Sequence, residues 1–404
     1  MTGIKNVDLD YTGDWTEALI QGDFAKRIER VRAQLKRMDA QAALCTANPN
    51  LLYLTGGICD GFYYLPVEGE PVFFVRRGEP EVPVGQVVRV LKPEQIPSWL
   101  QGEGMPLPDR LALEDEDISQ ALYARLAGAF PKAQAQPGSR ALRLARSVKT
   151  PLELSLIAQG CQIQSEIIAG AAQLYREGMT DWDFACAVEY TCRRKGHLGV
   201  FRTFGERMEA HMGTLLAGDN AAAVSPYDFA LGGAGRHPSL PVGQCGAPIL
   251  DGQTVMVDFS ANYNGYLGDI TRIFAKGVLP KEAYALHELS LQIQRELAQM
   301  GKPGACCAAL YERALEIARE GGAQRCFMGL ERQARFVGHG LGIQINELPV
   351  IAQADMALER GMVIALEPKF IVPGVGAVGT ENTYVVMEEG MRLLTRCPQD
   401  ILPL

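Results

Sequence analysis

Apolar and polar positions alternate along the first part of the chain in a pattern typical of an α/β domain. Residues 14–39 have the spacing of an amphipathic helix, and residues 41–47 form a short apolar run that predicts a buried strand. Further apolar runs at 70–77, 87–91 and 110–116 predict strands that continue the alternation. We therefore predict an α/β domain in the N-terminal part of the chain.

A strong helix-start signal marks the end of this domain. Thr150 is a favourable N-cap, Pro151 suits the first helical position, and Glu153 completes a capping box. A new helix is expected to begin there. We place the domain boundary just before it, so that residues 1–148 form the N-terminal domain and residues 149–404 form the second domain.

The second domain is predicted to begin with helices and to continue mainly with strands. Helices are expected at 151–176 and 181–195, followed by a polar, glycine-rich stretch at 197–250 that favours loops and short strands. Beyond it strands dominate, interrupted by two helices at 281–300 and 306–322. The fold class expected for the whole chain is α/β, with the α+β character of segregated helices and strands in its second part.

Four acidic residues stand inside apolar segments of the second domain, and one histidine lies among them. An ionised carboxylate in a buried strand is unfavourable unless a cation or hydrogen bonds compensate it. We expect two divalent cations, rather than a basic side chain, to neutralise this group. The five residues are Asp258, Asp269, His339, Glu367 and Glu381.

Turn signals suggest how these side chains meet. Asp258 and Asp269 flank an Asn-Gly pair that predicts a hairpin, so both carboxylates can face one volume. Thr271 shares a face with Asp269 by two-residue alternation. Glu367 and Glu381 likewise flank a glycine-rich turn and have a hairpin spacing. Two such hairpins and one imidazole predict a carboxylate-rich dinuclear site, which suits Mn, Co, Fe or Zn.

Glycines surround the histidine of this set. His339 lies in the segment FVGHGLGI, between Gly338 and Gly340. Glycine lets a backbone pass close to a neighbouring group, and we expect that group to be a ligand or a metal ion.

These segments resemble a known family. DFSANYNGYLGDITR, GHGLGIQINELP, LEPKF and GTENTYVV are similar, in the same order, to the metal-ligand segments of the dinuclear metallopeptidases. That family includes methionine aminopeptidase, Xaa-Pro dipeptidase (prolidase), aminopeptidase P and creatinase-like proteins. The resemblance implies an N-terminal creatinase/prolidase-like domain, a C-terminal pita-bread catalytic domain, and a homodimer. It also implies that Glu367 is both a metal ligand and a proton shuttle for a metal-activated bridging water.

The chain departs from the family pattern at two histidines that bind substrate. Asn346 stands where the family has a histidine, and it can donate a hydrogen bond but cannot transfer a proton at neutral pH. The family's upstream histidine has no match at its usual spacing, and His237 is the nearest candidate. We predict catalytic functions for Glu367, His237 and Asn346, while a solvent-exposed or packing histidine at 237 is the alternative.

A distinctive polar insertion covers residues 201–236. It is either a substrate lid or a simple surface excursion, and its candidate substrate-binding residues are Arg202, Tyr227 and Asp228.

Two functions follow as hypotheses. The first is hydrolysis of a peptide bond near the N-terminus of a small peptide by an enzyme similar to Xaa-Pro dipeptidase or aminopeptidase P. The alternative is a metal-dependent non-peptidase hydrolase or lyase of a small zwitterionic substrate on the same scaffold. A non-catalytic binding protein with a relic fold is a third reading, which the complete set of ligands disfavours.

The composition limits the binding partners and the cellular location that we expect. The 404 residues carry a net charge of −8, which argues against nucleic acid or an anionic membrane as a partner. The ten cysteines form no CxxC pair and are expected to be reduced. We find no apolar leader and no apolar run long enough to span a membrane, and so expect a cytoplasmic enzyme.

Overall fold

The computed structural model describes residues 15–80, 84–205, 211–227 and 229–404. The chain divides into two compact units, Met1–Leu152 and Glu153–Leu404. Among the described residues, no helix is both long and apolar enough to cross a membrane.

The first unit is built on a mixed sheet with helices on both faces. Its described part contains a six-stranded sheet in the order β4-β3-β2-β1-β5-β6, in which β1 pairs parallel to β5 and antiparallel to β2. The strands are β1 (Ala42–Cys45), β2 (Asp60–Pro66), β3 (Val72–Arg77), β4 (Gln86–Arg89), β5 (Arg110–Leu113) and β6 (Gln134–Pro137). The helices are α1 (Glu17–Arg37), α2 (Asn48–Thr55), α3 (Ile96–Gly102), α4 (Gln120–Ala129) and α5 (Ser139–Ser147).

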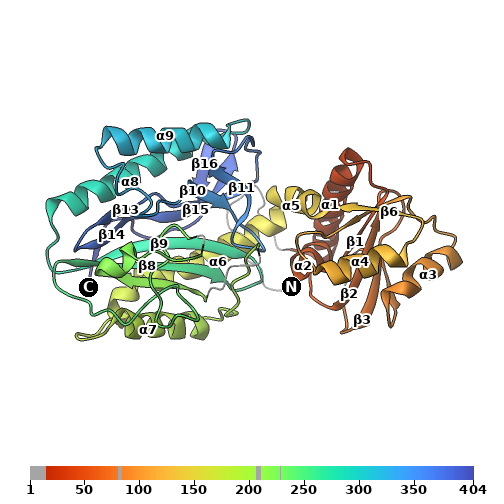
Figure 1. The fold of residues 1–404 in the computed structure, drawn as a ribbon, viewed down its shortest axis with the longest axis horizontal. Helices are drawn as coiled ribbons and strands as arrows, with labels where there is room; N and C mark the ends of the chain where they lie inside the picture. Colours follow the sequence, from red (N-terminus) through yellow and green to blue (C-terminus); the bar gives the residue numbers. More distant parts are fainter. Residues whose placement is uncertain (1–14, 81–83, 206–210, 228) are drawn as a thin grey trace. The chain divides into compact units, whose positions relative to one another are not determined.

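Buried side chains lie on both faces of this sheet. Leu44, Phe74 and Leu126 belong to one apolar core, which joins the sheet to α3 and α4. Tyr63 and Phe73, whose side chains alternate with those of that face, are also fully buried. Helices α1, α2 and α5 pack against one another in the same unit (Figure 1). Continuous apolar strands such as β1 are what a sheet buried on both faces requires.

The second unit is built around one large sheet. Within the described residues it has nine strands, with β11-β10-β12-β15-β9-β8-β7 as its main path, while β16 pairs with β15 and β17 with β9. These strands are β7 (Gly213–Ala217), β8 (Gln253–Asn262), β9 (Leu267–Lys276), β10 (Phe336–Gly340), β11 (Glu347–Ala352), β12 (Val363–Leu366), β15 (Glu381–Met387), β16 (Gly390–Leu393) and β17 (Leu402–Pro403). A separate two-stranded hairpin is formed by β13 (Lys369–Val372) and β14 (Gly376–Gly379).

Two pairs of helices cover this sheet. The first pair is α6 (Pro151–Ala169) and α7 (Asp181–Arg194), and the second is α8 (Lys281–Met300) and α9 (Cys307–Glu320). Apolar side chains of α6 and α7 pack against β7, β8 and β9 in one core. Helices α8 and α9 pack against each other, α8 against the β13–β14 hairpin and α9 against β11 (Figure 1).

One sequence-based expectation needs correction. Helix α6 ends at Ala169 and is followed by a short 3-10 turn, rather than continuing to about residue 176. The hairpin predicted between Glu367 and Glu381 is present, because Lys369 pairs with Gly379 in β13–β14 and Leu366 pairs with Asn382 in β12–β15.

Two glycines beside His339 allow neighbouring strands to approach closely. A Cβ atom at Gly338 would lie 2.3 Å from the carbonyl oxygen of Ala365 on β12. A Cβ atom at Gly340 would lie 2.2 Å from the carbonyl oxygen of Leu348 on β11. The groups that come close are therefore strands, not the ligand or metal ion that the sequence suggested.

We predict that Gly338→Ala lowers the free energy of unfolding by about 1–3 kcal/mol, because the added methyl group overpacks the β10–β12 contact. Chemical denaturation monitored by circular dichroism measures this change. Gly160→Ala is the matched control, because a Cβ atom there would meet only ordinary contacts of 3.7 Å and longer. An unfolding free energy for Gly338→Ala equal to that of Gly160→Ala would contradict the close approach.

Candidate metal centre

Five neighbouring strand segments of the large sheet carry the five residues of the predicted metal site. The segments follow the order β10, β12, β15, β9, β8 in the sheet. Strand pairing therefore brings residues that are far apart in sequence to the middle of one sheet. His339 lies on β10, Glu367 directly follows β12, Glu381 opens β15, Asp269 lies on β9, and Asp258 lies on β8.

The register of the ladder places three of these side chains on one face. Asp258 is opposite Thr271 in the β8–β9 ladder, and Glu381 is opposite Thr271 in the β9–β15 ladder. Asp269 precedes Thr271 by two positions and so points to the same side. The hairpin predicted between the two aspartates is thus present, with both carboxylates directed to one volume.

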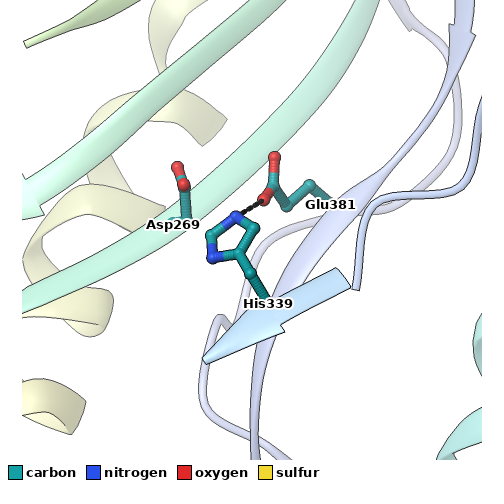
Figure 2. A group of neighbouring side chains, drawn as sticks. All are labelled: Asp269, His339 and Glu381. Carbon is teal, nitrogen blue, oxygen red and sulfur yellow. Dashed lines mark ion pairs between the residues drawn. The ribbon is translucent and has the colours of Figure 1, made fainter. Parts of the chain in front are cut away.

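Three of the ligating groups lie close enough to share an ion. The candidate ligand atoms of Asp269, His339 and Glu381 all lie within 4.8 Å of one another (Figure 2). His339 Nδ1 lies 3.2 Å from the carbonyl oxygen of Gly340, which can only accept a hydrogen bond. The proton of the neutral ring is therefore on Nδ1, and the lone pair of Nε2 is available to a metal ion.

One carboxylate oxygen of this trio has no hydrogen-bond partner. Glu381 Oε1 is buried and unpaired among the described residues, and it lies 3.9 Å from His339 Nε2. His339 Nε2 also lies 3.4 Å from Glu367 Oε1. A buried, unpaired oxygen facing an imidazole lone pair is what a metal ion would satisfy. The residues at this position therefore fit one divalent ion.

A lysine occupies the other side of the carboxylate group. Lys369 Nζ donates hydrogen bonds to Asp258 Oδ2 at 2.9 Å, Glu367 Oε2 at 2.8 Å and Glu381 Oε2 at 3.0 Å. Only 1% of the Lys369 side chain is exposed. The expectation that divalent cations alone compensate the acids was wrong, because a buried ammonium group neutralises part of their charge.

The charges within this group shift one another's pKa values. Burial and then the neighbouring Glu367 raise the pKa of Glu381 to about 7. Burial and the charge of Glu381 raise the pKa of Asp269 well above its usual range. Burial opposes ionisation of Glu367, but the Lys369 ammonium and the neighbouring His339 imidazole outweigh it and lower the pKa of Glu367 to about 2. Lys369 and His339 therefore favour the ionised form of Glu367, whereas burial and mutual repulsion oppose ionisation of Glu381 and Asp269.

Surrounding residues hold Glu381 in place. Thr271 Oγ1 donates a hydrogen bond to Glu381 Oε2 at 2.8 Å. The guanidinium of Arg272 is fully buried and donates to the backbone oxygen of Glu381 and to Asn382 Oδ1, both at 2.8 Å. Thr383 Oγ1 donates to the backbone oxygen of Asp269 at 2.8 Å. The strands that carry the carboxylates are thus cross-linked by side chains as well as by their ladders.

His237 was predicted to be catalytic, but its position supports the alternative. The residue is exposed, and its Nδ1 lies 2.8 Å from Ser239 Oγ within the same loop. No hydrogen bond or ion pair joins it to the five carboxylate and imidazole residues in the described part of the chain. The structure therefore describes a solvent-exposed loop histidine.

Asn346 and Arg202 lie on two segments that are bonded together. The Asn346 amide accepts a hydrogen bond from the backbone nitrogen of Phe204 at 2.6 Å and donates to its oxygen at 2.8 Å. The backbone nitrogen of Ile345 donates to the oxygen of Arg202. The Asn346 amide thus positions the segment at 202–204 beside the loop that follows His339, which was not foreseen from the sequence.

Arg202 has an unusual environment for a charged group. It is partly buried, and its Nη1 atom is enclosed without a hydrogen-bond partner in the described ranges. Burial lowers the pKa of its guanidinium. A half-buried guanidinium with a spare donor is suited to an anionic ligand.

Of the other two predicted substrate-binding residues, the structure describes Tyr227 only. Tyr227 lines a cavity of about 790 Å³, whose wall also includes Phe336. The Phe336 ring lies 6.3 Å from the His339 ring, so this cavity adjoins the strand that carries the imidazole. Asp228 lies outside the described residues.

We expect Glu381→Ala to abolish both metal binding and turnover, because it removes the unpaired oxygen between Asp269 and His339. Thr271→Val should weaken metal binding by about 10- to 100-fold, since it removes a hydrogen bond that orients Glu381. Calorimetric titration of the metal-free protein with Mn²⁺ measures the metal affinity of both variants. Thr191→Val is the control, because its hydroxyl bonds the backbone of its own helix, α7. Full affinity in Glu381→Ala would disprove the assignment of the site.

Comparisons with known proteins agree with the architecture. Residues 27–148 match the Creatinase/Prolidase N-terminal domain, and residues 155–388 match Metallopeptidase family M24. An X-Pro aminopeptidase structure from Thermotoga maritima superposes with a TM-score of 0.74 at 22% identity, over 92% of this chain and 100% of that one. The predicted α/β fold class, with an N-terminal creatinase/prolidase-like domain before a catalytic domain, is confirmed.

Two curated relatives are similar in sequence. An Xaa-Pro dipeptidase of Pyrococcus furiosus is 28% identical over 64% of this chain, a match that spans 65% of that enzyme. An Xaa-Pro dipeptidase of Pyrococcus horikoshii is 24% identical over 93% of this chain and 99% of its own length. These relatives favour a peptidase over the alternative of a non-peptidase hydrolase or lyase. With the M24 match extending over more than half of its residues, the chain belongs to metallopeptidase family M24.

Proposed function

We propose that this chain is a metal-dependent peptidase that cleaves small peptides with proline as the second residue. The observation that carries the proposal is the convergence of Asp269, His339 and Glu381 within an M24 domain, with a free imidazole lone pair and an unpaired carboxylate oxygen. The substrate class is supported by the similarity to Xaa-Pro dipeptidases.

The residues that would hold the ion are Asp269, His339 and Glu381. Once bound, a divalent ion supplies polarisation of the scissile carbonyl group and lowers the pKa of a coordinated water. Glu367 has one oxygen beside His339 and the other fixed by Lys369. This position lies beside the candidate ion, where the family resemblance assigns Glu367 the transfer of a proton from the attacking water to the leaving amine.

Arg202 is the candidate partner for the substrate's terminal carboxylate. Its partly buried guanidinium has a spare donor, and its segment is bonded to the loop that follows His339. In an Xaa-Pro dipeptide the terminal carboxylate belongs to the proline itself, so a fixed cation that binds it would favour short substrates. The cavity that Tyr227 lines adjoins the strand that carries His339 and is large enough for a small peptide.

Other features of the proposal remain predictions from the sequence. Mn, Co, Fe and Zn are all compatible with the donor set. A homodimer, a cytoplasmic location and a division into domains at 1–148 and 149–404 are part of the same proposal. The number of metal ions that the centre binds depends on the position of Lys369.

We expect hydrolysis of Xaa-Pro dipeptides and of Xaa-Pro-Xaa tripeptides by the purified full-length chain after loading with Mn²⁺, Co²⁺, Fe²⁺ or Zn²⁺ in turn. Product release measured by chromatography, together with the metal content, tests this. Chelated protein and the Glu381→Ala variant serve as controls. Bound metal with no cleavage of any peptide would refute a peptidase function.

Arg202→Met should raise KM for an Xaa-Pro dipeptide by about 10- to 100-fold, the cost of losing a hydrogen bond to a charged group. The same variant should treat a C-terminally amidated Xaa-Pro peptide like the wild type, because that substrate has no carboxylate. Arg202→Lys, which keeps the charge, should lie between the two. Equal losses on the acid and amide substrates would show that Arg202 does not bind the carboxylate.

A further inference from the structure

The Lys369 ammonium group lies where three carboxylates of the centre meet. Its contacts of 2.8–3.0 Å reach Asp258, Glu367 and Glu381, and so involve three of the four acids of the predicted dinuclear site. Asp269, the remaining acid, makes no such contact with Lys369 and faces His339 instead. The centre is therefore divided into a lysine side and an imidazole side.

The lysine takes the oxygens that a second ion would need. A second ion beside the one held by His339 would bind Asp258 and an oxygen of Glu381. Glu381 Oε2 already accepts hydrogen bonds from Lys369 and Thr271, and Asp258 Oδ2 accepts one from Lys369. Metal–carboxylate bonds are about 2.0–2.2 Å long, so an ion on these oxygens would lie within a few ångströms of the ammonium. Repulsion between the two cations in a buried site disfavours joint occupancy.

The lysine has little freedom to leave. Its backbone is held on both sides, because Lys369 pairs with Gly379 in the β13–β14 hairpin and its carbonyl oxygen accepts a hydrogen bond from Met328. Its side chain is almost fully buried, and its ammonium donates to three acids of the centre. Withdrawing the ammonium would leave a buried charge unpaired, at a cost of several kcal/mol.

The imidazole side stays open to an ion. Glu381 divides its two oxygens between the halves, since Oε2 bonds Lys369 and Thr271 while Oε1 is unpaired. His339 keeps its Nε2 lone pair on the same side. One ammonium and one divalent ion together neutralise three of the four carboxylate charges.

We propose that Lys369 permanently takes the place of the second metal ion, so that the centre binds a single divalent ion through Asp269, His339 and Glu381. Asp258 is then a partner of the lysine rather than a metal ligand. This replaces the two ions predicted from the sequence. It rests on the proposed metal centre but not on the substrate, because metal content is measured without any peptide.

The number of ions per chain is the decisive measurement. The purified chain, freed of metal with a chelator and equilibrated by dialysis against saturating Mn²⁺, should contain one Mn²⁺ by mass spectrometry of the metal. Its electron paramagnetic resonance spectrum should be that of an isolated Mn²⁺ ion. Two ions per chain with the spectrum of an exchange-coupled pair would overturn the proposal.

Substitution of Lys369 should create a second metal-binding position. Lys369→Ala removes the ammonium and vacates its volume, so the metal content should rise from one ion per chain to two, with a coupled-pair spectrum. Lys302→Ala, a change of a half-exposed lysine in the same unit, should stay at one ion. A folded Lys369→Ala protein that still binds one ion would contradict the proposal.

Variants of the two aspartates test the same idea without touching the lysine. Asp258→Asn should still bind one ion, with affinity reduced at most about tenfold, because Asp258 is not a ligand. Asp269→Asn should lose affinity at least about 100-fold, since direct ligands matter more than the residues behind them. Loss of the ion in Asp258→Asn to the same extent as in Asp269→Asn would show that Asp258 binds metal. These results stand whether or not the chain cleaves Xaa-Pro peptides.

Discussion

The structure of the second unit depends on how four carboxylates are compensated in the middle of one sheet. Asp258, Asp269, Glu367 and Glu381 come from neighbouring strand segments, and ladder register directs them to a common volume. Their mutual repulsion would separate β8, β9 and β15 if no cation were present. Lys369 meets this requirement in part with a fixed side-chain charge. The imidazole side completes it with groups that fit an exchangeable ion.

Local pattern was enough to identify the acids but not their partner. Each carboxylate stood out because it interrupted an apolar strand segment, and the Asn-Gly turn placed Asp258 and Asp269 on one hairpin. Lys369 also lies two residues after Glu367, a spacing that puts both side chains on one face of extended chain. That signal was available, but a lysine at a strand end is usually solvated. Only the β13–β14 hairpin, which turns Lys369 back toward the acids, shows that this one is not.

Residues expected to touch substrate were harder to place for a physical reason. Their positions depend on loops, where sequence distance says little about spatial distance. His237 had the nearest spacing to the first aspartate, yet its loop leaves it exposed and bonded to Ser239. Asn346 occupies the position of a family histidine, but its amide bonds the backbone of Phe204. A motif match therefore indicates an equivalent position in the sequence but not which group the side chain contacts.

A fixed ammonium and a metal ion are not equivalent ways to neutralise acids. An ion can be lost or exchanged when its concentration changes, whereas Lys369 is present in every folded chain. Because its three hydrogen bonds join the middle of β8, the residue after β12 and the start of β15, the lysine stabilises the centre before any metal binds. It also orients Glu367 and Glu381, so that their other oxygens, Oε1 in both residues, face His339. The lysine thereby preorganises the metal ligands, which lowers the cost of assembling them around an ion.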